Sequence, residues 1–341
     1  MNTPETNTPA IEISDLACTF ISGDGKKESH YTAVRDVNLS IRAGEFVSIV
    51  GPTGCGKSTI LNMTAGLLKP SHGTIRIFGE PLSGLNRRVG YMFQAENLMP
   101  WRSALGNVIA GLEFKGVKKS EAIEKGRHWL RRVGLAGFED SYPHHLSGGM
   151  RKRVSMAQTL IMDPDIILMD ESFSALDIQT RQLMENLLLD LWSGEKKAVL
   201  FITHDLGVVA HVADRIAVMY AGKIVEYGTA EDIFYDPLHP YTWSLLASMP
   251  DTNLKAGEEL SALHGTPPNM LFPPKGDAFA ERNPWAVAID FEKEPPMFKV
   301  SDTHYAATWL LHPNAPKVNR PEVLERRIAN SIKRREGKVN G

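Results

Sequence analysis

The stretch that decides the fold runs from Phe46 to Thr59 and reads FVSIVGPTGCGKST. It predicts a strand, a glycine-rich loop and the beginning of a helix. Because glycine lacks a Cβ atom, such a loop can wrap around a phosphate chain and point its N–H groups inward, at a helix N-terminus that already favours anions. The loop residues predicted to bind nucleotide are Gly51, Pro52, Thr53, Gly54, Cys55, Gly56, Lys57, Ser58 and Thr59.

Two side chains of this loop have specific predicted tasks. Lys57 is expected to hold the β- and γ-phosphates, and Ser58 is expected to place its hydroxyl on Mg²⁺. The alternative is a plain glycine-rich turn before a helix, and the helix that follows argues against it. Its expected buried stripe, with spacings of three and four residues, comprises Ile60, Leu61, Thr64, Leu67 and Leu68.

The composition indicates an ordinary soluble protein. The hydrophobic fraction is 43%, the charged fraction is 23% and the net charge is -2, so no global basic field suggests nucleic acid. Cys18 and Cys55 are too few for a disulfide framework, which favours a reducing cytosol. The N-terminus lacks signal-peptide features and no stretch approaches the ~18 apolar residues of a membrane span, so a membrane role would require a partner.

The N-terminal part of the chain predicts short strands. Their expected ranges are Ile11 to Phe20, Val37 to Ile41, Gly73 to Phe78 and Val89 to Phe93. Phe20 ends the first strand and could stack on an adenine base, with Tyr31 as the alternative. Either ring could equally be an ordinary core aromatic.

Residues 95 to 145 change to a helical pattern. Helices are expected at Ala104 to Phe114 and at Ser120 to Val133, and Trp101 and Trp129 are expected to contribute mostly to the core.

The motif Leu146-Ser147-Gly148-Gly149-Met150 then opens another helix, which Asp163-Pro164 should end. Ser147 could simply cap that helix. Two adjacent glycines at a helix start are unfavourable by themselves, and the close approach of an anion to the backbone would explain them.

Polar residues end the predicted buried strands. Gln94 follows Val89 to Phe93, where a lone glutamine is usually a polar terminus and gains weight only from the other motifs. Asp170 and Glu171 follow the apolar run Ile166 to Met169. They could cap the next helix, but beside a phosphate loop we expect Asp170 to bind Mg²⁺ and Glu171 to act as the base that polarises the attacking water.

The strand Ala198 to Thr203 ends on His204, where a γ-phosphate contact is reasonable because parallel strands end at a common edge. A hairpin from Arg215 to Tyr227 should close the domain near Pro237. The tail from His239 to Gly341 is rich in proline and predicts a small irregular module. Its last segment, Arg320 to Lys338, predicts a basic helix, for which a solvated surface is favoured over a nucleic-acid or lipid contact.

Together these motifs resemble the nucleotide-binding subunit of an ATP-binding cassette transporter, over roughly residues 11 to 237. The resemblance implies an α/β fold: a P-loop NTPase (RecA-like) core with an N-terminal antiparallel β-subdomain, an inserted α-helical subdomain at about 95–145 and a small C-terminal appendage. It divides the chain into an ATPase domain at 1–237 and an extension at 238–341.

The same resemblance assigns roles across a head-to-tail dimer. ATP would lie between the phosphate loop of one subunit and Ser147, Gly148 and Gly149 of the other. Gln94 would bind the metal and connect metal and water to the helical insertion, Asp177 would communicate across the dimer, and His204 would sense the γ-phosphate. Ser172 departs from the family, which mostly has proline there; this removes a backbone constraint and no catalytic group, so hydrolysis should survive.

Different parts of the chain resemble two different subfamilies of these transporters. Residues 31–190, including Asn97 to Arg102, resemble importers of nitrate, taurine and alkanesulfonates. Residues 201–341, including His239-Pro240-Tyr241-Thr242, resemble oligopeptide importers. The solute is therefore expected to be an oligopeptide, with nitrate, taurine or an alkanesulfonate as the alternative, and a natural or constructed mosaic stays open.

Many tails of the oligopeptide type carry four cysteines that look like an iron–sulfur ligand set. The matching positions of this chain hold Asp277, Asn283, Asp290 and Thr308. Oxygen ligands do not hold such clusters, so we expect ATP and Mg²⁺ as cofactors and no iron–sulfur cluster.

The expected function is that of an ATPase in a bacterial importer, bound peripherally at the cytoplasmic face of the membrane. Its partners would be a second nucleotide-binding subunit, identical or different, the permease, and indirectly an extracytoplasmic solute-binding protein. The rivals are a soluble cassette ATPase of DNA repair or translation, and a regulatory protein that does not hydrolyse ATP. Residues 95 to 145 are expected to dock the permease, and deleting residues 255 to 341 is expected to preserve ATPase activity.

Overall fold

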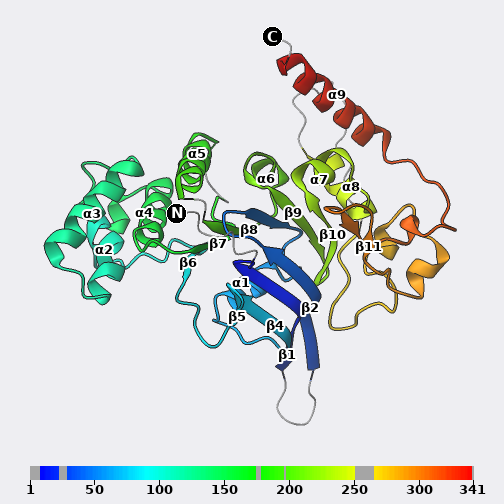
Figure 1. Cartoon of the computed structure of the whole chain (residues 1–341), viewed down its shortest axis with the longest axis horizontal. Coiled ribbons are helices and arrows are strands. Elements are labelled where there is room, and N and C mark those ends of the chain that lie inside the picture. The colour runs from blue at the N-terminus through cyan, green and yellow to red at the C-terminus, as the bar shows by residue number, and fades with distance from the viewer. Residues whose placement is uncertain (1–7, 23–28, 174–177, 196, 250–264, 340–341) are drawn as a thin grey trace.

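The computed structural model describes residues 8–22, 29–173, 178–195, 197–249 and 265–339. Two sheets and the helices around them build the molecule (Figure 1). The larger sheet contains, in spatial order, β11 (Phe298–Lys299), β12 (Tyr305–Ala306), β10 (Lys223–Thr229), β9 (Arg215–Tyr220), β3 (Phe46–Val50), β8 (Ala198–Thr203), β7 (Ile166–Asp170) and β6 (Val89–Met92). The neighbouring pairs from β9 to β6 are parallel, and the pairs from β9 to β11 are antiparallel.

The central strands are buried on both faces, which explains their continuous apolar sequences. Successive side chains of a strand point to opposite faces. Accordingly, Val199 and Phe201 of β8 belong to one hydrophobic core, and Leu200 and Ile202 belong to a second core. The sheet therefore separates two cores, and its polar ends are the part of these strands that is free for chemistry.

The smaller sheet covers one of these cores. Its strands, in spatial order, are β2 (Ser29–Ile41), β1 (Ile11–Ser22), β4 (His72–Ile77) and β5 (Glu80–Pro81), all paired antiparallel. Inward residues such as Ile11, Ile13 and Leu39 pack into the same core as Ile60 and Leu61 of the helix after β3. The predicted N-terminal antiparallel β-subdomain is confirmed.

The helices vary in length and surround the larger sheet. They are α1 (Lys57–Thr64), α2 (Ala104–Phe114), α3 (Lys119–Arg132), α4 (Gly148–Leu160), α5 (Ile178–Glu195), α6 (Leu206–Val212), α7 (Ala230–Tyr235), α8 (Pro240–Ala247) and α9 (Glu322–Val339). Short 3₁₀ helices lie at Pro143–His145, Ala280–Arg282, Ala288–Phe291 and Trp309–Leu311. Helices α2, α3 and α4 pack on one another as a lobe beside the sheet, and α9 projects from the opposite side (Figure 1). The inserted helical subdomain is thus confirmed.

Two burial predictions are wrong. Leu67 is 54% exposed, because α1 ends at Thr64 and Gly66, at a φ of 72°, turns the chain away from the helix axis. Trp101 is 72% exposed, because it precedes Ser103, the N-cap of α2, and stands outside the helix packing. The helix α2 itself occupies the predicted range, and most of its residues are buried.

The tail is not separate from the core sheet, as the hairpin prediction had implied. Strand β12 pairs antiparallel with β10, with Ala306 opposite Glu226, and β11 extends the sheet by one more strand. Phe279 of the tail is fully buried, with its ring edge-on to Tyr220 of β9 at 5.4 Å. Strand β10 would otherwise be an unpaired edge, and the tail covers it.

Candidate functional site

Glycine is required in the phosphate loop by packing from beneath. A Cβ atom at Gly51 would lie 2.2 Å from the carbonyl oxygen of Met219. At Gly56, where φ is 106°, a Cβ atom would lie 2.4 Å from the carbonyl oxygen of Ala33. Gly54 has a φ of 80° but no neighbour that a Cβ atom would meet, so its requirement is conformational.

Lys57 begins α1 and lies beneath the loop, with only 4% of its surface exposed. Its ammonium group donates to the carbonyl oxygens of Gly51 and Pro52, at 2.9 and 3.0 Å. The same nitrogen lies 3.9 Å from Oε1 of Glu171. A buried cation that the loop surrounds with its backbone fits the recognition of a phosphate chain.

Ser58 and Asp170 face each other at the end of β7. The hydroxyl of Ser58 donates to Oδ1 of Asp170 at 3.1 Å, and burial raises the pKa of that carboxyl. Tyr91 of β6 lies within 3.4 Å of Oδ2 of Asp170 and within 3.1 Å of Asn62. A hydroxyl and one carboxylate side by side fit Mg²⁺, which takes oxygen ligands and usually few of them from the protein. Sequence reasoning missed Tyr91, whose only signal was its position near the end of the predicted strand Val89 to Phe93.

Glu171 is at the centre of the site. Its backbone has a φ of 42°, uncommon for a residue with a side chain, and its N–H donates to the carbonyl of Ile202 at 3.0 Å. Oε2 lies 3.4 Å from Nε2 of Gln94 and 3.4 Å from Nδ1 of His204. Strands β6, β7 and β8 therefore bring together three predicted residues at the edge where Lys57 and Ser58 also lie.

Ser172 has a structural role at the position where the family resemblance led us to expect proline. It is fully buried, and its hydroxyl donates to the carbonyl of Met92 at 3.2 Å. This bond connects the end of β7 to the end of β6. A hydrogen bond thus supports the backbone next to Glu171.

Lys152 was not predicted. It is 5% exposed on α4, and its ammonium group donates to the carbonyl of Phe93 at 3.1 Å and also to that of Gln94. Burial lowers the pKa of this lysine. The contact joins α4 directly to the segment that carries Gln94.

Ser147 and the glycines after it begin α4. The hydroxyl of Ser147 accepts from the N–H of Met150 at 3.3 Å, so the alternative prediction of an N-cap is confirmed. Ser147 and Gly148 are exposed, and a Cβ atom at Gly149 would lie 3.0 Å from Cγ2 of Thr180. Packing against α5 therefore explains one glycine, whereas Gly148 stays open to an external partner.

Of two other residues predicted to contact nucleotide, Phe20 and Asp177, the structure describes only Phe20. Phe20 is 42% exposed and pairs in register with Tyr31, whose ring packs partly into the core. Phe20 is thus the more available of the two rings for stacking. Asp177 lies outside the described residues.

The four tail positions that correspond to cysteines in related tails all cap turns. Oδ1 of Asp277 accepts from the N–H of Phe279 at 3.1 Å, and Oδ1 of Asn283 accepts from Trp285 at 3.0 Å. Likewise, Oδ2 of Asp290 accepts from Val287 at 2.7 Å, and Oγ1 of Thr308 accepts from Leu310 at 3.3 Å. These oxygens thus stabilise the local turns. The absence of an iron–sulfur cluster stays a prediction.

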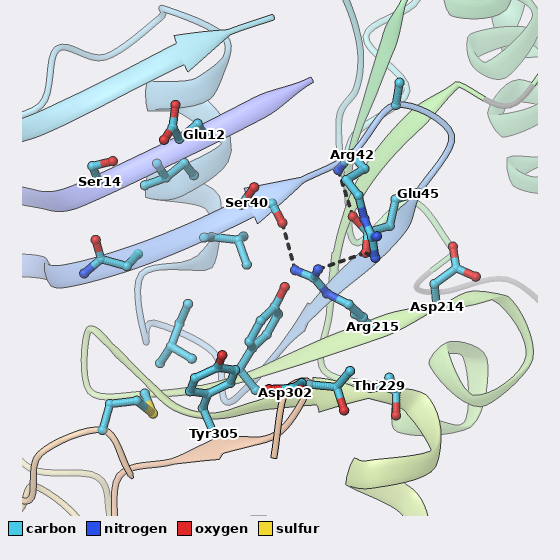
Figure 2. Close-up of a pocket in the computed structure, with 18 of the residues that line it drawn as sticks. Glu12, Ser14, Ser40, Arg42, Glu45, Asp214, Arg215, Thr229, Asp302 and Tyr305 are labelled. Carbon is cyan, nitrogen blue, oxygen red and sulfur yellow. Dashed lines mark hydrogen bonds and ion pairs between the residues drawn. The ribbon is translucent and has the colours of Figure 1, made fainter. Parts of the chain in front are cut away.

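A groove of about 1110 Å³ lies at the amino-terminal ends of β3 and β9, away from the strand ends that carry the predicted site residues. It is bounded by the smaller sheet, the beginning of β9 and the tail (Figure 2). Arg215 crosses it, donating to the carbonyl of Ser40 at 2.8 Å and pairing with Glu45 at 3.1 Å. Its guanidinium also lies 4.5 Å from the ring centre of Tyr227. These contacts join three parts of the fold, and the groove contains none of the predicted site residues.

Comparisons with known proteins agree with this geometry. The family model "ABC transporter" matches residues 34–174, and "Oligopeptide/dipeptide transporter, C-terminal region" matches residues 225–289. The second match begins within β10, as expected for a tail that continues the sheet.

Two relatives match most of the chain. The oligopeptide transport ATP-binding protein OppD of Bacillus subtilis is 44% identical, over 96% of this chain and 97% of the relative. The dipeptide transport ATP-binding protein DppD of Lactococcus lactis is 40% identical, over 90% of this chain and 93% of the relative.

Among solved structures, the dimeric cassette MJ0796 in a post-hydrolysis state with ADP and Pi has a TM-score of 0.59 and 33% identity. It covers 64% of this chain and 98% of its own. The match to OppD extends over 96% of this chain and so includes both segments, 31–190 and 201–341, that resemble different subfamilies. The chain belongs to the ATP-binding cassette transporter family.

Proposed function

We propose that this chain is the ATP-hydrolysing subunit of an oligopeptide importer. The observation that carries the proposal is the meeting of Lys57, Asp170, Glu171 and His204 at one sheet edge, in a chain similar to OppD over 96% of its length. The relatives' names favour oligopeptide over nitrate, taurine or alkanesulfonate as the solute. We retain the functional division into an ATPase domain at 1–237 and an extension at 238–341, although both contribute to one sheet.

The phosphate loop would bind the triphosphate of ATP. Its N–H groups and the Lys57 ammonium would surround the β- and γ-phosphates, and Phe20 would stack on the adenine base. Ser58, Asp170 and Gln94 are the residues that would hold Mg²⁺. The ion, when bound, neutralises charge that develops on the phosphate oxygens.

Glu171 would be the general base. Its carboxylate would accept a proton from water as the water oxygen bonds to the γ-phosphorus and the bond to the bridging oxygen of ADP breaks. Gln94 and His204 flank this carboxylate at 3.4 Å and would orient it and the water. His204, 55% exposed, can also reach toward the γ-phosphate.

A second nucleotide-binding subunit would complete the site. Ser147 and Gly148 are exposed at the N-terminus of α4, a position suited to an anion. We propose that they contact ATP bound by the partner subunit and that Asp177 communicates across this interface. The dimeric state of MJ0796 supports the proposal.

The helical lobe at 95–145 would dock the permease. It exposes Trp101 and Phe114, whose exposed fractions are 72% and 79%. Gln94, which directly precedes this lobe, contacts Glu171, and Lys152 of α4 holds the backbone carbonyls of Phe93 and Gln94. Since α4 packs on α2 and α3, a permease helix resting on the lobe would move when the site closes. Within the described ranges, none of the helices combines the length and the hydropathy of a membrane span. We propose that the permease attaches this chain to the cytoplasmic face of the membrane.

Capture from detergent-solubilised membranes tests the proposal. The tagged chain should bring down a permease, and the reconstituted complex should take up labelled oligopeptides with ATP. Taurine and nitrate serve as competing solutes, and Lys57→Ala, which should lose nucleotide binding, serves as the inactive control. Uptake of taurine or nitrate without peptide uptake would overturn the solute assignment, whereas ATPase activity with no permease would favour a soluble ATPase.

A further inference from the structure

The C-terminal appendage reaches the segments on which the phosphate loop rests. We propose that Glu294 is a positioning residue for that loop, and that it sets nucleotide affinity through Arg35 and Lys223. The inference rests on nucleotide binding by the loop and concerns a residue outside the family's nucleotide motifs.

Two segments form the floor beneath the loop. One is Ala33–Asp36 in β2, and the other is the β9–β10 turn at Ala221–Gly222 with Met219 before it. The N–H of Gly222 donates to the carbonyl of Cys55 in the loop at 3.0 Å. The N–H of Arg35 donates in turn to the carbonyl of Gly222 at 3.0 Å. A shift of the turn would therefore reach the loop through one hydrogen bond.

Glu294 binds Arg35 in one segment of the floor and Lys223, the residue that directly follows the other segment. Its Oε1 pairs with the guanidinium of Arg35, and its Oε2 lies 2.5 Å from the ammonium group of Lys223. Lys223 also lies 2.9 Å from Asp36, which closes a four-residue ion cluster. The exposed fractions of Arg35, Lys223 and Glu294 are 22%, 27% and 28%, so water screens these charges less than at an open surface.

The tail holds Glu294 in place. The residue before it, Lys293, accepts a hydrogen bond through its carbonyl from the Trp309 indole at 2.9 Å. The residue after it is Pro295, which restricts the backbone of Glu294 to extended conformations. A second tail contact lies on the same hairpin, where Arg282 donates to the hydroxyl of Tyr220 at 3.0 Å.

Neutralising Glu294 would remove the carboxylate that bridges Arg35 and Lys223, and Lys223 would keep only its pair with the more exposed Asp36. Repulsion between the two cations would favour separation of β2 from the β9–β10 turn, and the loop above would lose its fixed support. Glu171, Asp170 and His204 end other strands, so the chemical step should be less affected. The expected signature is therefore a higher KM for ATP with nearly unchanged kcat.

Glu294→Gln in the full-length chain tests the inference, with Arg320→Gln as the matched control. Arg320 also joins the tail to the core, through Asp236 at 2.9 Å, but Asp236 is the residue that follows α7 and does not belong to the floor. We expect Glu294→Gln to raise the KM for ATP and the Kd of a fluorescent ATP analogue by about threefold to tenfold, with kcat within twofold. Arg320→Gln should leave all three values near wild type.

Thiol labelling supplies a readout independent of ATPase activity. Cys55 is buried in the loop, and Cys18→Ala makes it the only cysteine of the chain. In that background and without nucleotide, Glu294→Gln should speed the labelling of Cys55 severalfold and Arg320→Gln should not. Equal KM values and equal labelling rates in the two variants would overturn the inference. The Lys57→Ala variant distinguishes this outcome from failure of the proposed function. If Lys57→Ala bound nucleotide as tightly as the wild type, the assignment of the phosphate loop as the ATP site would be wrong.

Discussion

Oε2 of Glu171 lies 3.4 Å from Nδ1 of His204, although the two residues follow different strands. Strands β7 and β8 are parallel neighbours, with Asp170 opposite Ile202, so their carboxyl ends meet. The 15% exposure of the Glu171 side chain leaves room for a water molecule to approach it. This pair is the centre of the proposed hydrolytic site.

Glu171→Gln should slow ATP hydrolysis by at least about 10²-fold while leaving ATP binding near normal, because the amide retains the shape but cannot accept the proton. Single-turnover hydrolysis and a nucleotide-binding titration measure the two effects. The variant should also form an ATP-stabilised dimer in sedimentation. Unchanged turnover would show that another group is the base.

Ser147→Arg should abolish hydrolysis while the monomer still binds nucleotide, because this serine is proposed to act on ATP held by the partner. Mixing Ser147→Arg with Lys57→Ala subunits should restore part of the ATPase activity. The mixed dimer contains one composite site with both lesions and one intact site. A mixture without any recovered activity would favour a site built within one subunit.

Trp101→Glu combined with Phe114→Glu should uncouple transport without lowering basal ATPase activity. Both side chains are exposed on the proposed docking lobe, and a charge would oppose burial against a permease helix. The matched control is Phe272→Glu, which alters an aromatic side chain of the tail that is 81% exposed. Copurification of the permease should fall for the first variant and not for the control; the reverse pattern would transfer docking to the tail.

Asp277→Asn should stabilise the protein at pH 8 by about 1–2 kcal/mol and should have little effect at pH 4. Burial raises the pKa of Asp277 to about 6, and its amide isostere can still accept from Phe279. The folded wild type binds this proton more tightly than the unfolded chain, so this group's contribution to stability decreases as pH rises from about 4 to 6. Thermal unfolding midpoints across this range measure the effect, and a pH-independent difference would contradict it.

His304→Ala should lower stability more strongly at pH 6 than at pH 9. His304 of the tail lies 2.8 Å from Glu226 of β10, and both are buried. Burial lowers the pKa of His304, but the hydrogen bond to Glu226 and its charge outweigh burial and raise it. The stabilisation is therefore complete below the unfolded pKa and is lost as pH rises through the folded pKa.

Breaking a buried pair costs about 3–5 kcal/mol when the remaining charge is left uncompensated. The N–H groups of Leu238 and His239 would still donate to Glu226, so we expect a loss near the lower end of this range. Thermal unfolding midpoints at pH 6 and pH 9 measure the loss, and an equal loss at both would argue against titration of His304.

Deleting residues 255 to 341 would remove β12, the partner strand of β10, so we now expect lower stability and lower ATPase activity than the sequence alone suggested.

Local motifs were the best predicted part of the site. The phosphate loop, the strand before it and the beginning of α1 lie where the sequence placed them, because turn chemistry and apolar periodicity act over a few neighbouring residues. The end of α1 was predicted less well, since the helix stops at Thr64 and Leu67 lies outside it. The sequence also placed Asp170, Glu171 and His204 at one edge of the sheet. Neighbouring parallel strands end at the same edge, so the polar residues at their carboxyl ends lie close together. Burial was predicted less well, as Trp101 shows, because exposure depends on how the helix before or after a residue is packed.

The sequence by itself determined the cassette fold, the nucleotide motifs and the oxygen side chains at the four tail positions. Only the tertiary structure decided how the tail joins the core. The pairing of β12 with β10, the burial of His304 on Glu226 and the contacts of Glu294 beneath the loop connect residues far apart in the chain. No local periodicity encodes such contacts. They form because an exposed sheet edge and buried charges require partners, and folding brings those partners from any part of the chain.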